Sequence, residues 1–152
     1  MSASLLLAGS IVLLSACGNE ASPIPVTGGG TLDCPTFQSS VNPIFDQNLG
    51  GRTCSASGCH SVFSSAGGAF KIYPNALPNT VEMQANYLSA KGMANLSDPS
   101  QSKLLLEPLA GAQSIVGSHT GGDIFASTSD PNYSVILGWI SMQVLGPSVC
   151  FP

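Results

Sequence analysis

Two cysteines and a histidine stand close together in the middle of the chain, in the run CSASGCH from Cys54 to His60. Two nearby thiols can add across the two vinyl groups of a haem, and a histidine directly after the second thiol can reach the iron. The common spacing is C-x-x-C-H, whereas this chain has four residues between Cys54 and Cys59. The small residues Ser55 to Gly58 suit a loop that bulges outward. The run predicts one covalently bound c-type haem, with His60 as the proximal iron ligand.

Three other roles for the same residues stay open. Cys54 and Cys59 could form a small disulfide or half of a zinc site, although the chain has only two histidines and no second cysteine pair nearby. They could also form a dithiol redox pair, but the spacing is wrong for that and no thioredoxin-like pattern surrounds them. The cysteine–histidine adjacency in an exported chain favours haem.

Export is predicted from the N-terminus. Leu5 to Leu14 is an apolar run of signal-peptide length, far too short for a membrane-spanning helix. It leads into LSACG, which is typical of a bacterial lipobox, so residues 1–16 are predicted to be a lipoprotein signal peptide and Cys17 to be the lipidated new N-terminus. The first four residues depart from the usual pattern because they lack Lys and Arg. A plain secretory peptide, with Cys17 free or in a disulfide, is the alternative.

Residues 17–31 are predicted to be a flexible tether. They contain Pro23, Pro25 and three consecutive glycines, with no helical or strand period. The folded domain is then expected over residues 32–152. The resemblance to enteric lipoproteins, with Gly18 rather than Asp after the cysteine, implies transport to the outer membrane. The chain is therefore expected in a bacterial cell envelope, anchored by lipid and facing the periplasm or the cell surface.

The composition limits the partners. Hydrophobic residues make up 43% of the 152, enough for a packed core, while charged residues make up only 8%. The four basic residues are scattered along the chain. Nucleic-acid binding is not expected, because no basic patch is available to neutralise phosphates.

Apolar periodicity predicts a mostly α fold, with about four short helices joined by loops rich in glycine and serine. The first helix is expected from about Pro35 to Asn48, because four apolar residues between Phe37 and Phe45 share one helical face. Asp33 is its expected N-cap. Pro43 predicts a kink or a restart within it.

The second helix is expected from about Thr80 to Lys91, with Asn79 and Glu82 at capping-box spacing and Gly92 as the stop. Before it, Phe70 to Tyr73 could form a short strand.

The last two helices open alike, each at a Ser-Asp-Pro triplet with the aspartate as N-cap and the proline at the first helical position. The third starts with Asp98 as its cap and ends before Pro108. The fourth starts with Asp130 as its cap and ends before Gly146, with an apolar face from Tyr133 to Val144.

This order of helices around the cysteine motif resembles the class I, or monohaem-type, bacterial cytochrome c family. The resemblance rests on VNPIF before the motif (Val41–Phe45), on SKLLLEP (Ser102–Pro108), on HTGG (His119–Gly122) and on the last helix with Trp139. It covers about residues 34–142 at the level of pattern rather than close identity. It implies a cytochrome c-like fold around one haem c, whose last helix packs across the first.

The family places a distal iron ligand, methionine or histidine, just before the last helix. The resemblance therefore implies His119 as the distal ligand, with Met93 in the turn after the second helix as the sulfur alternative. Met83 and Met142 are expected to pack in the core. An open iron, with no distal protein ligand, is the third possibility.

The first and last helices cross in this family, which implies a disulfide between Cys34 and Cys150 that closes a long loop. The aromatic residues Phe37, Phe45, Tyr133 and Trp139 are expected to pack in the core and against the haem.

The expected function is electron transfer by a membrane-anchored cytochrome, with redox proteins of the cell envelope as partners and no catalytic residues of its own. Two alternatives remain: a haem enzyme or gas sensor with an open distal site, and a haem-free envelope lipoprotein held by disulfides.

Overall fold

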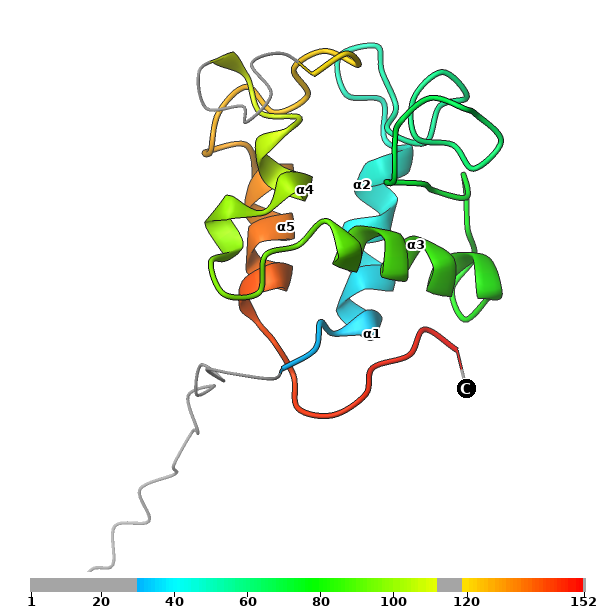
Figure 1. Ribbon diagram of the computed structural model, residues 1–152, viewed down its shortest axis with the longest axis vertical. Helices are drawn as coiled ribbons and strands as arrows, with labels where there is room; N and C mark the ends of the chain where they lie inside the picture. Colours follow the sequence, from blue (N-terminus) through cyan, green and yellow to red (C-terminus); the bar gives the residue numbers. More distant parts are fainter. Residues whose placement is uncertain (1–29, 112–118, 152) are drawn as a thin grey trace, which may run out of the picture.

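The computed structural model describes residues 30–111 and 119–151, and within them the chain is mostly helical, as predicted. Figure 1 shows the helices joined by long loops. Their bounds are α1 Cys34–Thr36, η1 Phe37–Val41, α2 Asn42–Asp46, α3 Val81–Gly92, η2 Pro99–Gln101, α4 Lys103–Leu106 and α5 Pro131–Ser141. None of the described helices is long and apolar enough to cross a membrane.

The first predicted helix is a continuous run of α1, η1 and α2. Asp33 caps it as expected, with a carboxylate oxygen accepting from the Thr36 amide at 2.8 Å. The middle section is a π-helix, in which the Asn42 amide donates to the Phe37 carbonyl five residues back. Pro43, which has no amide hydrogen to donate, follows this wider turn directly, so the irregularity lies just before the proline. The run ends at Asp46, two residues earlier than predicted.

The second predicted helix is α3, but its cap differs from the expectation. Thr80, not Asn79, is the N-cap, and its hydroxyl accepts from the Met83 amide at 3.2 Å. Asn79 has a φ of 60°, a left-handed conformation that belongs to the turn before the helix. The predicted capping box is therefore wrong by one residue, although the helix itself is confirmed.

The third predicted helix is split and the fourth is shortened. Asp98 precedes a single 3₁₀ turn, η2, and makes no capping bond to it, so that predicted cap is wrong. Asp130 does cap α5, accepting from the Asn132 amide at 2.8 Å. The last helix ends at Ser141 because Val144 pairs instead with Thr31 in an antiparallel bridge.

The short strand predicted over Phe70–Tyr73 is absent. Ile72 makes one isolated parallel bridge to Ser61, and the bridges in the described part of the chain are all of this isolated kind. That pairing still matters, because it joins the segment to the residue directly after His60.

Aromatic side chains from three helices form the centre of the core. The Phe37 ring lies 5.2 Å from Trp139 and 5.6 Å from Tyr87, so η1, α5 and α3 meet there. The two polar tips are satisfied: Trp139 Nε1 donates to the Asp33 carbonyl at 2.8 Å, and Tyr87 Oη donates to the Leu32 carbonyl at 2.6 Å. All four aromatic residues predicted for the core are buried, namely Phe37, Phe45, Tyr133 and Trp139.

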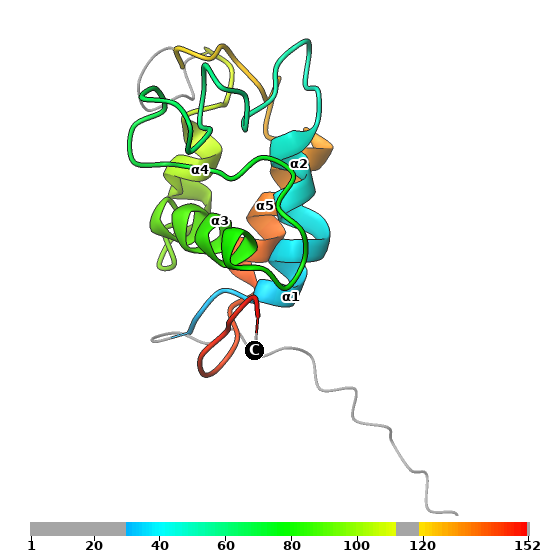
Figure 2. The same cartoon turned by 90° about the vertical axis from the view of Figure 1, so that its right-hand side faces the viewer.

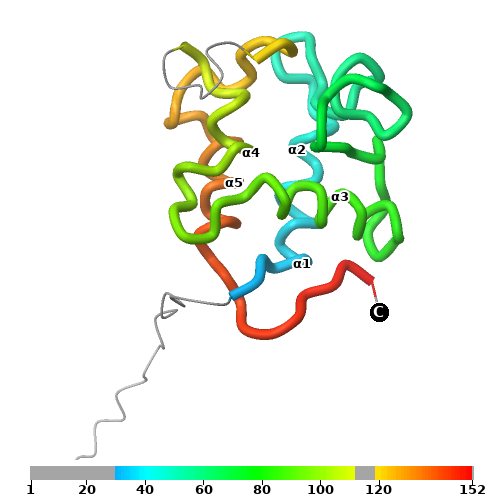
Figure 3. Tube along the Cα trace, viewed as in Figure 1, coloured from blue at the N-terminus to red at the C-terminus, as the bar shows by residue number. Residues whose placement is uncertain are grey.

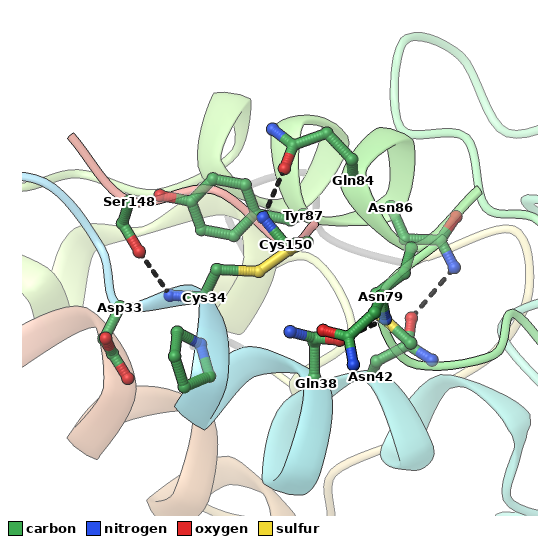
Figure 4. Close-up of a disulfide and its surroundings, with 12 residues drawn as sticks. Asp33, Cys34, Gln38, Asn42, Asn79, Gln84, Asn86, Tyr87, Ser148 and Cys150 are labelled. Carbon is green, nitrogen blue, oxygen red and sulfur yellow. Dashed lines mark hydrogen bonds between the residues drawn. A yellow bond between two sulfur atoms is a disulfide. The ribbon is translucent and has the colours of Figure 1, made fainter. Parts of the chain in front are cut away.

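Cys34 and Cys150 form a disulfide beneath this core, with Cα atoms 5.3 Å apart. Figure 4 shows the Cys34 amide donating to Ser148 Oγ and the Cys150 amide donating to Gln84 Oε1, at 2.8 and 2.6 Å. The C-terminal segment is thereby fixed to α1 and to α3. The pairing implied by the family resemblance is present in the structure.

The helices have two distinct ends. The loops that follow α2 and that precede α5 lie together at the top of Figures 1 and 2, whereas the first described residues and the segment after α5 lie at the bottom. The tube in Figure 3 shows how far the chain runs without regular structure at the top. We call residues 52–72 and 119–125 the histidine end, and residues 30–34 and 142–151 the disulfide end.

Candidate functional site

The cysteine–histidine motif forms a compact loop directly after α2. The Ser55 amide donates to the Phe45 carbonyl at 3.0 Å, which fixes the start of the loop to the helix. The His60 amide donates to the Cys54 carbonyl, also at 3.0 Å, and returns the end of the motif to its beginning. Ser57 and Gly58 are exposed, as expected of a bulge, while Ser55 is buried. Both cysteines are free thiols and partly buried.

The His60 ring is oriented by the loop that follows the motif. Its Nδ1 lies 3.0 Å from the carbonyl oxygens of both Gly67 and Phe70. Carbonyl oxygens only accept hydrogen bonds, so Nδ1 carries the proton and Nε2 presents its lone pair. A carbonyl partner on the far nitrogen is the arrangement that fixes metal-ligating histidines.

Aromatic packing holds the same ring. The centroid of the Phe70 ring is 4.8 Å from that of His60 and 5.4 Å from that of Phe45. His60 is therefore connected through Phe70 to the end of α2. The Ile72 amide donates to the His60 carbonyl at 2.7 Å and closes this contact from the backbone side.

Gly67 is required by this arrangement. It has a φ of 82°, which favours glycine. A Cβ atom there would lie 2.7 Å from His60 Nδ1 and would also collide with the Cys59 carbonyl. The neighbouring Gly68 also has a positive φ, of 58°, but a Cβ atom there would meet nothing within 4 Å.

His119 stands on a separate tight turn. The Gly122 amide donates to the His119 carbonyl at 2.7 Å, and the Gly122 carbonyl lies 3.0 Å from His119 Nδ1. The turn precedes a short pairing with the residues after α4, in which the Ile124 amide donates to Pro108 and the Ala110 amide to Phe125. As with His60, the carbonyl leaves Nε2 as the nitrogen with a free lone pair.

The two histidines meet at the histidine end. Their ring centroids are 5.8 Å apart and their planes differ by only 9°. Two imidazole nitrogens on opposite sides of one metal ion, each about 2.0–2.1 Å from it, would be about 4 Å apart, with the ring centroids further out. The 5.8 Å between the two centroids is compatible with such a spacing. His60 and His119 could therefore hold a haem iron, with Cys54 and Cys59 on the same loop as His60.

The methionines lie elsewhere. Met93 is the C-cap of α3 and packs against the hydrophobic core, and Met83 is buried in that core. Met142, which we expected to be buried, is 64% exposed, because α5 ends one residue before it and the chain turns away. It is His119, and not one of these methionines, that the structure places beside His60.

The alternative roles of the cysteines find less support. Burial, reinforced by the nearby Cys59 and Asp46, raises the pKa of the Cys54 thiol to about 11. A redox-active dithiol needs a lowered pKa, so this environment is unsuited to thiol exchange. Among the described residues, no three His, Cys, Asp or Glu side chains cluster to hold a metal ion. A haem iron needs only two protein ligands, since the porphyrin supplies its other nitrogens.

Cys17 and its predicted lipidation, together with the signal peptide, lie outside the described residues. Comparison with family models, with curated proteins and with solved structures found no match for this chain.

Sequence reasoning missed the residues that orient the two rings. The carbonyls of Gly67, Phe70 and Gly122 carry no sequence signature, because any residue supplies a carbonyl. The only signal was the presence of paired glycines shortly after each histidine. The position of Arg52 was also missed: its guanidinium lies against Gly122, so the segment before the cysteine motif contacts the turn that carries His119.

Proposed function

We propose that this chain is an electron carrier that holds one covalently attached haem c between His60 and His119. The observation that carries the proposal is the pair of near-parallel imidazoles at 5.8 Å, each with Nδ1 bound to a backbone carbonyl. Cys54 and Cys59 would supply the thioether links, and a lipid on Cys17 would anchor the chain in the cell envelope. Redox proteins of that envelope would be its partners.

The two histidines would give the haem protein ligands on both faces. A second imidazole on the distal face leaves no open position for a gas or a peroxide, which favours electron transfer over catalysis or sensing. Ligation by two histidines lowers the reduction potential relative to histidine and methionine. The proposed protein would therefore donate electrons more readily than a carrier with a methionine ligand.

The redox chemistry itself would come from the haem, and the chain would bind, orient and shield it. The carbonyls of Gly67 and Phe70 would keep the proton of His60 on Nδ1, and that of Gly122 would do the same for His119. Fixed rings reduce the structural rearrangement between the oxidised and reduced states. Phe70 and Phe45 would keep water from the proximal side.

A visible spectrum of the purified full chain tests the proposal, after expression with a cytochrome maturation system. We expect sharp α and β bands on reduction, retention of the haem by the protein after acid–acetone extraction, and no spectral change with carbon monoxide. The absence of haem absorbance would contradict the proposal. A reduced spectrum that shifts with carbon monoxide would favour an open iron, and thus a sensor or an enzyme.

A further inference from the structure

The segment after α5 displays apolar side chains to solvent although it is firmly held. Met142, Leu145 and Val149 are 64%, 78% and 60% exposed. We call these three residues the apolar rim. Exposed single apolar residues are common, but three within eight positions at one end of a domain are a local concentration.

The apolar rim is fixed in place. Val144 exchanges two backbone hydrogen bonds with Thr31, at 2.9 and 2.8 Å, and Gln143 Nε2 donates to the Leu96 carbonyl at 2.7 Å. Cys150 adds the disulfide to Cys34. Because the backbone on both sides of Leu145 is held, the exposed side chains belong to a defined surface.

The chain enters the domain at the same place. A Cβ atom on Gly30 would lie 2.8 Å from the Gln143 side chain, and Thr31 is paired with Val144. The first described residues, Gly30 and Thr31, therefore lie beside Gln143 and Val144, the two residues between Met142 and Leu145. The predicted tether to the lipidated Cys17 therefore joins the domain beside the apolar rim.

We infer that the apolar rim rests on the lipid surface to which Cys17 is anchored, so that the histidine end points away from the membrane. This rests on the lipid anchor of the proposed function. The two ends of the helices lie at opposite sides of the molecule in both ribbon views (Figures 1 and 2). An electron carrier oriented in this way would present His60 and His119 to partner proteins on the side of the domain that faces away from the membrane.

Tether length supports a lipid surface as the occupant. Only 13 residues separate Cys17 from Thr31, and a random-coil chain of that length has a mean span of about 20 Å. The anchor would therefore hold the apolar rim close to the bilayer at a high effective concentration, so even a weak apolar contact would be occupied.

The charge pattern supports the same occupant. The stretch from Met142 to Val149 contains no charged residue, so anionic headgroups would not repel it. Asp33 lies at this end with its carboxylate bonded to Thr36, and Lys91 Nζ donates to Thr31 Oγ1 at 2.8 Å. Apolar side chains bordered by a lysine are typical of surfaces that insert shallowly into the headgroup region.

Hydroxyl-radical footprinting of the lipidated full chain in vesicles of phosphatidylethanolamine and phosphatidylglycerol tests this orientation. We expect oxidation of Met142 and Leu145 to fall several-fold relative to the C17S chain, which has no anchor and stays in solution. Phe63 at the histidine end is 81% exposed and serves as the internal reference, so its oxidation should not change.

A matched pair of variants separates the apolar rim from the anchor alone. L145Q should restore the oxidation of Met142 in vesicles toward the level of the soluble chain. L88Q, which changes an exposed leucine on α3, should leave the protection intact.

Two results would overturn the inference in different ways. If vesicle-bound protein is oxidised equally at both ends, the anchor holds but the rim does not rest on lipid. If the protein does not sediment with vesicles, the anchor itself fails and the orientation fails with it. The haem spectrum, recorded on the same samples, is independent of both results and keeps the haem proposal separate.

Discussion

The two ends of this domain are held together by different means. The disulfide end combines a covalent link, two backbone bonds between Thr31 and Val144, and an aromatic core just above. The histidine end has no regular helix or strand in its described residues, and its side chains are positioned by carbonyls and by turns with glycine. The first end maintains the fold, and the second sets the direction of two imidazole rings. The comparison implies that each end can be damaged without the other.

The largest expected effect is the loss of haem from the histidine end. The double variant C54S/C59S removes both thiols, and H60A removes the proximal ligand, so neither should retain covalent haem. Denaturing gels stained for haem peroxidase activity measure this directly. The disulfide between Cys34 and Cys150 should still form in both variants, as mass spectrometry of peptides without reduction would show. Haem that stays covalently attached to C54S/C59S would contradict the assignment.

The next largest effect concerns the disulfide end. The bond joins residues 116 apart in the sequence, and closing a loop of that length contributes about 4–5 kcal/mol on the chain-entropy model. C34S/C150S should lower the free energy of unfolding by up to this amount in urea titrations. Where the variant remains folded, its haem spectrum should match the wild type. A changed spectrum at full folding would show that the two ends are coupled.

A smaller effect is expected from two neighbouring glycines at the histidine end. G67A and G68A both place a side chain at a positive φ, which costs about 1–2 kcal/mol. Only the G67A methyl group would press on His60 Nδ1. We expect a larger loss of stability in G67A, whose methyl group would also collide with the Cys59 carbonyl, and a shifted reduction potential in G67A alone. Equal potentials in the two variants would show that the Gly67 contact does not orient the ring.

The smallest expected effect is a slower alkylation of the Cys54 thiol in the haem-free, reduced chain. Because burial raises the pKa of Cys54 to about 11, its alkylation by iodoacetamide near pH 9 should be slower than in the same chain unfolded in urea. The folded state keeps this proton between pH 9 and 11 while the unfolded state loses it. The contribution of the protonated Cys54 thiol to the free energy of unfolding is therefore full below pH 9 and is lost as the pH rises through about 11. Equal alkylation rates in the folded and unfolded chains would contradict the burial of Cys54.

The helices were predictable where local chemistry decides them. Asp33 and Asp130 cap their helices as expected, since each carboxylate accepts from a backbone amide of the first turn, whereas Asp98 makes no such bond to η2. The prediction failed where tertiary contacts override local pattern. Val144 has the periodicity of the last helix, yet its pairing with Thr31 ends that helix earlier.

The candidate site was predictable in its residues but not in its geometry. Cys54, Cys59 and His60 follow from the motif, and His119 came from a family resemblance. Their mutual placement depends on the paths of two loops that have few regular hydrogen bonds. The orientation of each ring depends on carbonyls that every residue possesses, so residue types could not reveal it.

The most direct test of the central claim is the response of H119A to carbon monoxide, with M93L as the matched control. If His60 and His119 are the two axial ligands, H119A retains covalent haem but becomes high-spin and binds carbon monoxide on reduction. M93L should remain low-spin and unresponsive, like the wild type. An H119A protein that stays low-spin and does not bind carbon monoxide would contradict the claim that His119 is the distal ligand.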